Sequence, residues 1–198
     1  MHRNFRRPIL KGVCVWFTGL PCSGKTTTAE RLTEYLAESG ESVTLLDSDM
    51  IRPVLCPDLG FSREDRRSNV LRIAFVAREI VRHRGIVVVA TVSPFDEDRK
   101  LVRSMFDPPC FVQVYITTPL EECERRDVKG HYAKARAGQL PMFTGISSPY
   151  EVPDDSELIC DTETHSVTAS ALEIFQAVQY RRSESDVRTA LPTLRAFV

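Results

Sequence analysis

The chain has 198 residues, of which 42% are hydrophobic and 27% are charged. These proportions are ordinary for a globular protein with a substantial core, and they argue against a disordered or fibrous chain. The formal net charge of −1 gives no electrostatic argument for binding a nucleic acid polymer.

Short apolar strands alternate with amphipathic helices along the chain. Strands are predicted at 13–18, 43–46, 86–90, 111–116 and 158–160, and helices at 25–39, 63–83, 96–105, 119–126 and 166–180. The run Ile-Val-Val-Val-Ala at 86–90 is the strongest strand signal. This alternation predicts right-handed βαβ crossovers and therefore an α/β fold, with a parallel β-sheet flanked by helices on both faces.

Two segments lack a clear period. Residues 127–153 mix Lys, Arg, Gly and Pro and predict a mobile lid, and residues 181–198 predict a loosely held tail. No Gly/Ser linker or repeat divides the chain, so we expect one domain over 1–198. Its core would span about 12–180, with 1–11 and 181–198 as terminal extensions.

The location of the protein is predicted from three absences. No apolar stretch approaches the ~20 residues that cross a bilayer, so we expect no membrane association. At the N-terminus Lys11 interrupts a short apolar run and no small-residue cleavage site follows, unlike a signal peptide. The six cysteines form no Cys-x-x-Cys pair, which disfavours zinc and disulfide frameworks and suits a reducing cytoplasm.

A complete phosphate-binding pattern lies between the first predicted strand and helix. It reads Gly19-Leu20-Pro21-Cys22-Ser23-Gly24-Lys25-Thr26. Its glycines let backbone N–H groups face the phosphates of ATP, and the following helix adds its positive N-terminal end. Residues 19–26 and the next residue, Thr27, are therefore the expected ATP-binding residues. We expect Lys25 to reach the β- and γ-phosphates and the Thr26 hydroxyl to bind Mg²⁺. Cys22 is either a tolerated small residue or a redox-sensitive thiol.

Two carboxylates, Asp47 and Asp49, follow the second strand, at the sheet edge where ligands bind. On an extended segment they would point to the same side. They could then hold a Mg²⁺-bound water or accept a proton from an attacking hydroxyl. The alternative is a helix N-cap formed by Ser48 or Asp49, and the two readings are compatible.

Further polar and aromatic residues favour an acceptor site. Arg52, Arg66 and Asn69 could surround an anion and a polar ring on which Phe61 stacks. The alternative is a solvated, arginine-rich start of a helix. After the third strand, Ser93 could orient substrate or be phosphorylated, or it could belong to a plain strand-to-loop turn.

The order of these motifs resembles that of the adenylylsulfate kinase (APS kinase) family, a family of P-loop small-molecule kinases. The shared set comprises residues 19–26; Asp47-Ser48-Asp49 with Arg52; residues 59–62 with Asp65-Arg66 and Asn69; Ser93-Pro94; residues 126–130 and 132–136; residues 143–146; and Pro149-Tyr150-Glu151. The resemblance spans about residues 12–180. The chain departs from the family pattern at Pro21, Cys22, Ser48, Phe95 and His131.

The resemblance implies transfer of the γ-phosphoryl group of ATP to the ribose 3′-hydroxyl of adenosine 5′-phosphosulfate (APS). It implies that Arg52, Phe61, Arg66 and Asn69 hold the acceptor, that Lys129 and Phe143 close over it, and that Arg126 lies near the adenine of ATP. Asp49 would orient or deprotonate the hydroxyl, and Ser93 is the family's candidate phosphoserine. We also expect a homodimer and a functional link to ATP sulfurylase.

Two other functions remain open from the sequence. One is a kinase of another nucleotide-like acceptor; Phe61 argues against a bare sugar, because a stacking aromatic suggests a base. The other is a nucleotide-binding switch without turnover, although the guanine-reading Asn-Lys-x-Asp motif is absent.

Overall fold

The computed structural model describes residues 11–194, with side chains described as far as residue 183. Its centre is a five-stranded sheet in the order β2-β3-β1-β4-β5, in which every neighbouring pair is parallel. The strands are β1 (Val13–Thr18), β2 (Val43–Asp47), β3 (Ile86–Ala90), β4 (Phe111–Ile116) and β5 (Leu158–Cys160). Because β1 lies between β3 and β4, the strand order reverses at its carboxyl end, where open α/β sheets bind their ligands.

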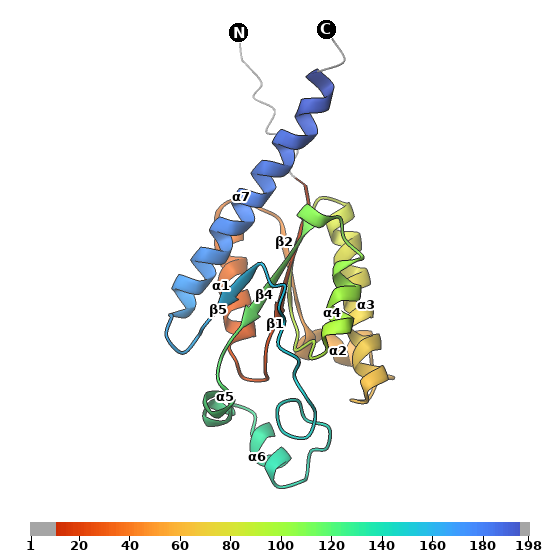
Figure 1. Ribbon diagram of the computed structural model, residues 1–198, viewed down its shortest axis with the longest axis vertical. Helices are drawn as coiled ribbons and strands as arrows, with labels where there is room; N and C mark the ends of the chain where they lie inside the picture. The colour runs from red at the N-terminus through yellow and green to blue at the C-terminus, as the bar shows by residue number, and fades with distance from the viewer. Residues whose placement is uncertain (1–10, 195–198) are drawn as a thin grey trace.

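Helices cover both faces of the sheet (Figure 1). They are α1 (Lys25–Glu38), α2 (Ser48–Leu55), α3 (Arg63–Arg82), α4 (Asp96–Arg103), α5 (Leu120–Arg126), α6 (His131–Arg136) and α7 (Val167–Leu194), with a short 3₁₀ turn at Pro108–Cys110. The pair α1 and α7 lies on one face, and α3 and α4 lie on the other. The short helices α5 and α6 lie beyond the carboxyl ends of the strands. The predicted α/β fold is confirmed.

Two apolar layers hold the helices to the sheet. Alternate residues of β1 face opposite sides, as the two-residue period of a strand requires. Val15 and Phe17 belong to the layer packed under α1 and α7, whereas Trp16 belongs to the layer packed under α3 and α4. All three side chains are fully buried, so β1 runs through the middle of the core.

Apart from α6, which lies in the segment 127–153 where no helix was predicted, the structure differs from the sequence prediction in two helices. First, α2 begins directly after β2, where we expected an extended segment. Second, α7 continues to Leu194, whereas the sequence predicted a helix that ends at residue 180. No proline or glycine interrupts the chain between 181 and 191, and the buried Arg182 is ion-paired with Glu41 at 2.8 Å. Positions 1–10 and 195–198 of the expected extensions lie outside the described residues.

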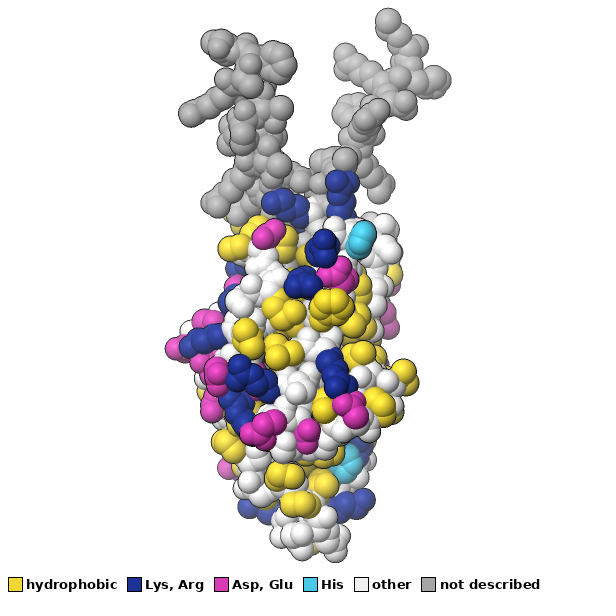
Figure 2. All heavy atoms as spheres, turned by 90° about the vertical axis from the view of Figure 1, so that its right-hand side faces the viewer, with side chains coloured by type: hydrophobic (Ala, Val, Ile, Leu, Met, Phe, Trp, Pro, Cys, Tyr) yellow, Lys and Arg dark blue, Asp and Glu magenta, His cyan; other side chains and the backbone are white. Residues whose placement is uncertain are grey.

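Charges of both signs are mixed on the outer surface of α3 and α4 (Figure 2). Glu97 forms ion pairs with Arg63 and Arg67, at 3.1 and 2.9 Å. Such a surface presents no continuous basic patch of the kind that binds a nucleic acid backbone.

The sequence also led us to expect no disulfide framework and no membrane-spanning segment. All six cysteines are free thiols, and five of them are buried, the exception being the half-buried Cys22. Within residues 11–194, none of the helices has the length and apolar character needed to cross a bilayer.

Candidate active site

The phosphate loop leaves β1 at Gly19 and enters α1 at Lys25. Gly19 and Gly24 have φ values of 150° and 101°, a region that favours glycine. A Cβ at Gly19 would also lie 2.8 Å from the carbonyl oxygen of Ile116, so only glycine fits there. Cys22 takes a left-handed conformation too, with φ 59°, although it has a side chain. The loop therefore has the backbone shape that the motif predicts.

The carbonyl of Ser23 is held by three side chains from the far half of the chain. Thr118 Oγ1 and Thr162 Oγ1 donate to it at 2.7 and 2.8 Å, and the Arg126 guanidinium lies at 3.4 Å. Arg126 also donates to the carbonyl of Thr162 at 3.1 Å. The structure therefore brings the predicted Arg126 to the start of α1. It adds Thr118 and Thr162, which sequence reasoning missed although they follow β4 and β5 at the functional edge.

Lys25 lies folded against its own loop. Its Nζ donates to the carbonyls of Gly19 and Leu20 at 3.0 and 2.6 Å, and the residue is only 8% exposed. Burial is the main cause that lowers the pKa of Lys25 to about 8, against nearby negative charge that includes Asp49 and Asp47. The ammonium is thus poorly hydrated and is available to an anion that enters the loop.

Asp47 has two partners at the end of β2. Its Oδ2 accepts a hydrogen bond from the Thr26 hydroxyl at 2.6 Å, and its Oδ1 accepts one from the backbone N–H of Asp49 at 2.8 Å. The second bond makes Asp47 the N-cap of α2. The prediction that Asp47 and Asp49 point to one side of an extended segment is therefore wrong, and so is the alternative cap at Ser48 or Asp49.

Asp49 is instead paired with the predicted lid. Lys129 Nζ lies 2.5 Å from Asp49 Oδ2, across 80 positions of sequence. Both side chains are more than half exposed, and the bond to Asp49 is the main cause that raises the pKa of Lys129. The carboxylate expected to act on the acceptor and the lysine expected to close over it are thus in direct contact.

Two arginines lie beside the ring of Phe61. The guanidinium carbons of Arg52 and Arg66 lie 4.4 and 5.6 Å from the centroid of its ring, which is half exposed. Arg66 also donates to the carbonyls of Phe61 and Met142, so it joins α3 to the lid. Burial, followed by the positive charge of Arg52, lowers the pKa of Arg66. Two cations beside one exposed ring suit a ligand that is both aromatic and anionic.

Asn69 lies one turn beyond Arg66 on α3 and is 3% exposed. Its Oδ1 has no hydrogen-bond partner among the described residues. A buried amide oxygen left without a donor costs about 1–3 kcal/mol. Asn69 is thus prepared to accept a hydrogen bond from a ligand.

Ser93 turns its side chain into the core. It is 2% exposed, and its Oγ accepts a hydrogen bond from the indole Nε1 of Trp16 at 3.0 Å. Its backbone is left-handed, with φ 41°, and Arg99 holds its carbonyl at 2.7 Å. The hydroxyl is thus engaged in the core, which favours the strand-to-loop turn, one of the two readings that the sequence left open.

The predicted lid is partly ordered by its own packing. It contains α6, and the ring of Phe143 packs edge-on against Tyr132, with centroids 4.9 Å apart. At its far end the backbone N–H of Glu151 donates to the carbonyl of Pro94 at 2.8 Å, and Arg99 donates to the carbonyl of Glu151 at 2.7 Å. The lid is therefore anchored beside the loop that follows β3.

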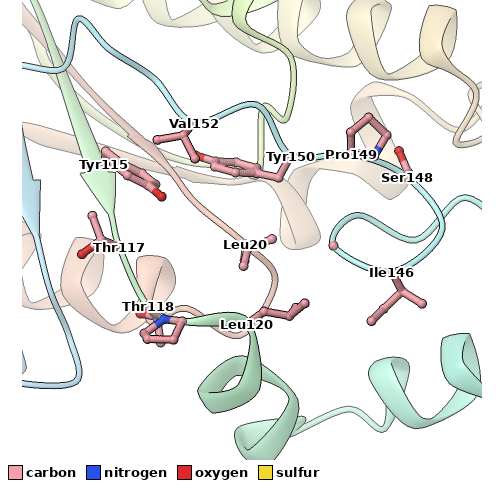
Figure 3. Close-up of a pocket in the computed structure, with 12 residues that line it drawn as sticks. Leu20, Tyr115, Thr117, Thr118, Leu120, Ile146, Ser148, Pro149, Tyr150 and Val152 are labelled. Atoms are coloured by element: carbon pink, nitrogen blue, oxygen red, sulfur yellow. The ribbon is translucent and has the colours of Figure 1, made fainter.

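A cavity of about 560 Å³ lies between the phosphate loop, the end of β4 and the lid (Figure 3). Leu20 faces it from the phosphate loop, Thr117 from β4's end, and Ile146 from the lid, while Tyr115 and Tyr150 stack with centroids 6.0 Å apart. Leu20 is the one predicted site residue among those that line it. The cavity is therefore separate from the acceptor residues on α2 and α3.

Comparison with known proteins finds one family throughout the core of the chain. The model of the family described as adenylylsulphate kinase matches residues 11–161. The adenylyl-sulfate kinase of Geotalea uraniireducens is 46% identical over 188 residues, 95% of this chain and 88% of the relative. The probable adenylyl-sulfate kinase of Halalkalibacterium halodurans is 47% identical over 178 residues, 90% of this chain and 88% of the relative.

Solved structures agree with the sequence relatives. The Mycobacterium tuberculosis APS kinase CysC in complex with AMPPNP and APS superposes with a TM-score of 0.82 at 40% identity, covering 86% of this chain and 99% of that one. A hexameric APS kinase from Thiobacillus denitrificans gives a TM-score of 0.66 at 32% identity, covering 90% of this chain and 31% of that one.

Proposed function

The chain belongs to the adenylylsulfate kinase family, and from this membership together with its site we infer how it works. It is an adenylyl-sulfate kinase: it transfers the γ-phosphoryl group of ATP to adenosine 5′-phosphosulfate, giving 3′-phosphoadenosine 5′-phosphosulfate for sulfate assimilation. The roles of individual residues are our proposal. Two observations carry it: a phosphate loop at the carboxyl end of β1, and an exposed aromatic ring flanked by two arginines.

The donor half is built on the phosphate loop. Backbone N–H groups of the loop, from residues other than Pro21, and the N-terminal end of α1 bind the phosphates. Lys25 exchanges its loop carbonyls for phosphate oxygens, a better partner for a poorly hydrated ammonium. Arg126 lies on the adenine side, which its contacts with Ser23 and Thr162 support.

The Thr26 hydroxyl and the Asp47 carboxylate fit a magnesium ion. Both offer oxygen ligands, which Mg²⁺ prefers, and the 2.6 Å bond between them brings these oxygens together. When bound, the ion would neutralise charge between the β- and γ-phosphates. We therefore assign to Asp47 the metal-binding role expected of Asp49.

The acceptor half lies on α2, α3 and the lid. We propose that the adenine of APS stacks on Phe61, and that Arg52 and Arg66 bind the phosphosulfate oxygens. The unpartnered Oδ1 of Asn69 would accept a hydrogen bond from the base. Lys129 and Phe143 close over the acceptor from the lid and keep out water, which would otherwise take the phosphoryl group.

Asp49 is the proposed proton acceptor. When the acceptor binds, Lys129 would leave Asp49 for an anionic oxygen, and the freed carboxylate would orient the 3′-hydroxyl. The hydroxyl oxygen forms a bond to the γ-phosphorus while the bond to the β–γ bridging oxygen breaks. The proton passes to Asp49, and ADP carries away the electron pair of the broken bond. Ser93 takes no part in this transfer, because its hydroxyl is bonded to Trp16.

The setting of the enzyme is also a proposal. The family resemblance suggests a homodimer that uses the APS made by ATP sulfurylase. A reducing cytoplasm suits a chain whose six cysteines are all free thiols.

A coupled assay tests the function. Purified protein receives Mg-ATP with and without APS, and both ADP and the nucleotide product are measured. We expect equimolar ADP and 3′-phosphorylated product only when APS is present, and no product with Lys25→Ala. ADP release with another nucleotide-like acceptor, but not with APS, would favour the broader kinase instead. Binding without turnover of any acceptor would favour a switch.

A further inference from the structure

Tyr132 in α6 contacts both halves of the site. Its hydroxyl donates to the carbonyl oxygen of Pro21 in the phosphate loop at 3.0 Å. Its ring meets the ring of Phe143 edge-on, at a centroid distance of 4.9 Å and an angle of 81°. Tyr132 is only 1% exposed, so both contacts are made in the interior of the protein.

The position of Tyr132 is fixed from several directions. The Asp127 carboxylate accepts the backbone N–H groups of Tyr132 and Ala133, both at 3.0 Å, which caps the start of α6. Burial is the main cause that raises the pKa of the Tyr132 phenol, so the hydroxyl stays protonated and remains a donor at any physiological pH. The contact with Pro21 is therefore directional, with the hydroxyl as the donor.

Tyr132 binds the carbonyl of the peptide between Pro21 and Cys22. This peptide must take a defined orientation when a phosphate binds the loop. The Pro21 carbonyl and the Cys22 N–H belong to one planar trans peptide, so they point in opposite directions. When the N–H turns toward a phosphate oxygen, the carbonyl turns away from it. Tyr132 lies on that far side, where its hydroxyl donates to the carbonyl oxygen. Cys22 has the left-handed φ of 59°, a conformation that its surroundings must stabilise.

The lid approaches the phosphate loop closely at the same place. A Cβ at Gly145, two residues after Phe143, would lie 3.1 Å from Leu20 Cδ2 and 3.9 Å from the Tyr132 hydroxyl. Gly145 also has a positive φ of 94°, so glycine is required there. The segment carrying Phe143 thus packs closely against Leu20 of the phosphate loop.

We propose that Tyr132 is a positioning residue that couples triphosphate binding in the phosphate loop to closure of Phe143 over the acceptor. The proposal rests on the proposed function, since it takes Phe143 as part of the acceptor site. Phosphate oxygens fix the peptide between Pro21 and Cys22, this peptide fixes Tyr132, and the tyrosine ring fixes Phe143. Each substrate then raises the affinity of the other by the same factor, as thermodynamic linkage requires.

The test compares wild type with Tyr132→Phe, which keeps the ring on Phe143 and removes only the hydroxyl. A non-hydrolysable ATP analogue is titrated with and without APS, and APS with and without the analogue. We expect wild type to show mutual enhancement of at least ~5-fold. We expect Tyr132→Phe to reduce it to within about twofold of unity, while each substrate alone binds within about threefold of wild type.

Two further variants control the experiment. Tyr35→Phe removes a hydroxyl from α1 that accepts from Arg31 at 3.4 Å, away from the lid, and should keep the full enhancement. Phe143→Leu should lose it, and the double variant with Tyr132→Phe should lose no more than either single one. Thermal unfolding shows that each variant is folded.

The outcomes separate this inference from the proposed function. Wild-type enhancement retained in Tyr132→Phe would show that the hydroxyl carries no coupling, and absence of enhancement in wild type would also overturn the inference. In either case APS-dependent ADP release would still support the kinase. Absence of that release from wild-type protein would overturn the function itself.

Discussion

Replacement of Lys25 by methionine should change how the stability of the protein depends on pH. Lys25 is 8% exposed, and burial lowers its pKa from the ordinary 10.5 to about 8. Each tenfold change in proton affinity corresponds to about 1.4 kcal/mol, so holding the ammonium in the folded protein at pH 7 costs about 3 kcal/mol. Methionine has a similar length and no charge to bury.

The direction in which stability changes with pH depends on whether the folded or the unfolded protein binds the Lys25 proton more tightly. Between pH 8 and 10.5 the folded protein has released the Lys25 proton, whereas the unfolded chain still binds it. Stability therefore rises with pH across that window in wild type, and this contribution is absent from the variant. The difference in unfolding free energy between the two proteins should shift in favour of wild type by about 2–3 kcal/mol from pH 7 to pH 10.

Urea denaturation of both proteins at pH 7, 8.5 and 10 measures this shift. Comparing the two at each pH cancels the titration of every other group. The exposed Lys134, replaced by methionine, provides the matched control and should give a pH dependence parallel to wild type. Parallel curves for Lys25→Met and wild type would refute the reasoning, because they would mean that the buried ammonium is as well solvated as in the unfolded chain.

Three further substitutions test the site. Asp49→Asn should lower kcat by at least ~10²-fold with little change in the KM for ATP, since a carboxamide cannot accept the proton; near-normal turnover would move that role elsewhere. Asp47→Asn should raise the Mg²⁺ concentration needed for half-maximal activity by about tenfold, because a charged oxygen beside Thr26 is lost; an unchanged magnesium titration would contradict the assignment. Ser93→Ala should keep most of the activity but lower the free energy of unfolding by about 1 kcal/mol, since Trp16 loses its hydrogen-bond acceptor. An inactive but stable Ser93→Ala protein would instead indicate a catalytic hydroxyl.

Local signals predicted most of the fold. The strands at 86–90, 111–116 and 158–160 have the predicted bounds, because continuous apolar runs bounded by polar residues define buried strands. The helix α2 was missed because it has only eight residues and contains Pro53, which argues against a helix. The length of α7 was missed because residues 181–194 lack a clear apolar period, the signal on which the prediction relied.

The residues of the site also divide into those that the sequence could predict and those that it could not. The phosphate loop is contiguous in sequence, so its shape follows from the spacing of its glycines. The roles of Asp47 and Asp49 depend on where α2 begins. On an extended strand the two carboxylates would point to the same side, but the helical turn that starts at Ser48 directs them apart. The contact of Tyr132 with Pro21 joins residues 111 positions apart, and no local sequence pattern predicts such a contact.

The hydrogen bond from Trp16 to Ser93 also makes the protein its own optical probe. Trp16 is the single tryptophan of the chain, it is fully buried, and it lies in the middle strand of the sheet. Its indole nitrogen is bonded to the loop between β3 and α4, to which the far end of the lid is anchored through Pro94. All tryptophan fluorescence of the protein therefore comes from one site beneath the loop between β3 and α4. A spectral change on adding a nucleotide reports movement at that point, without any label or any second tryptophan to subtract.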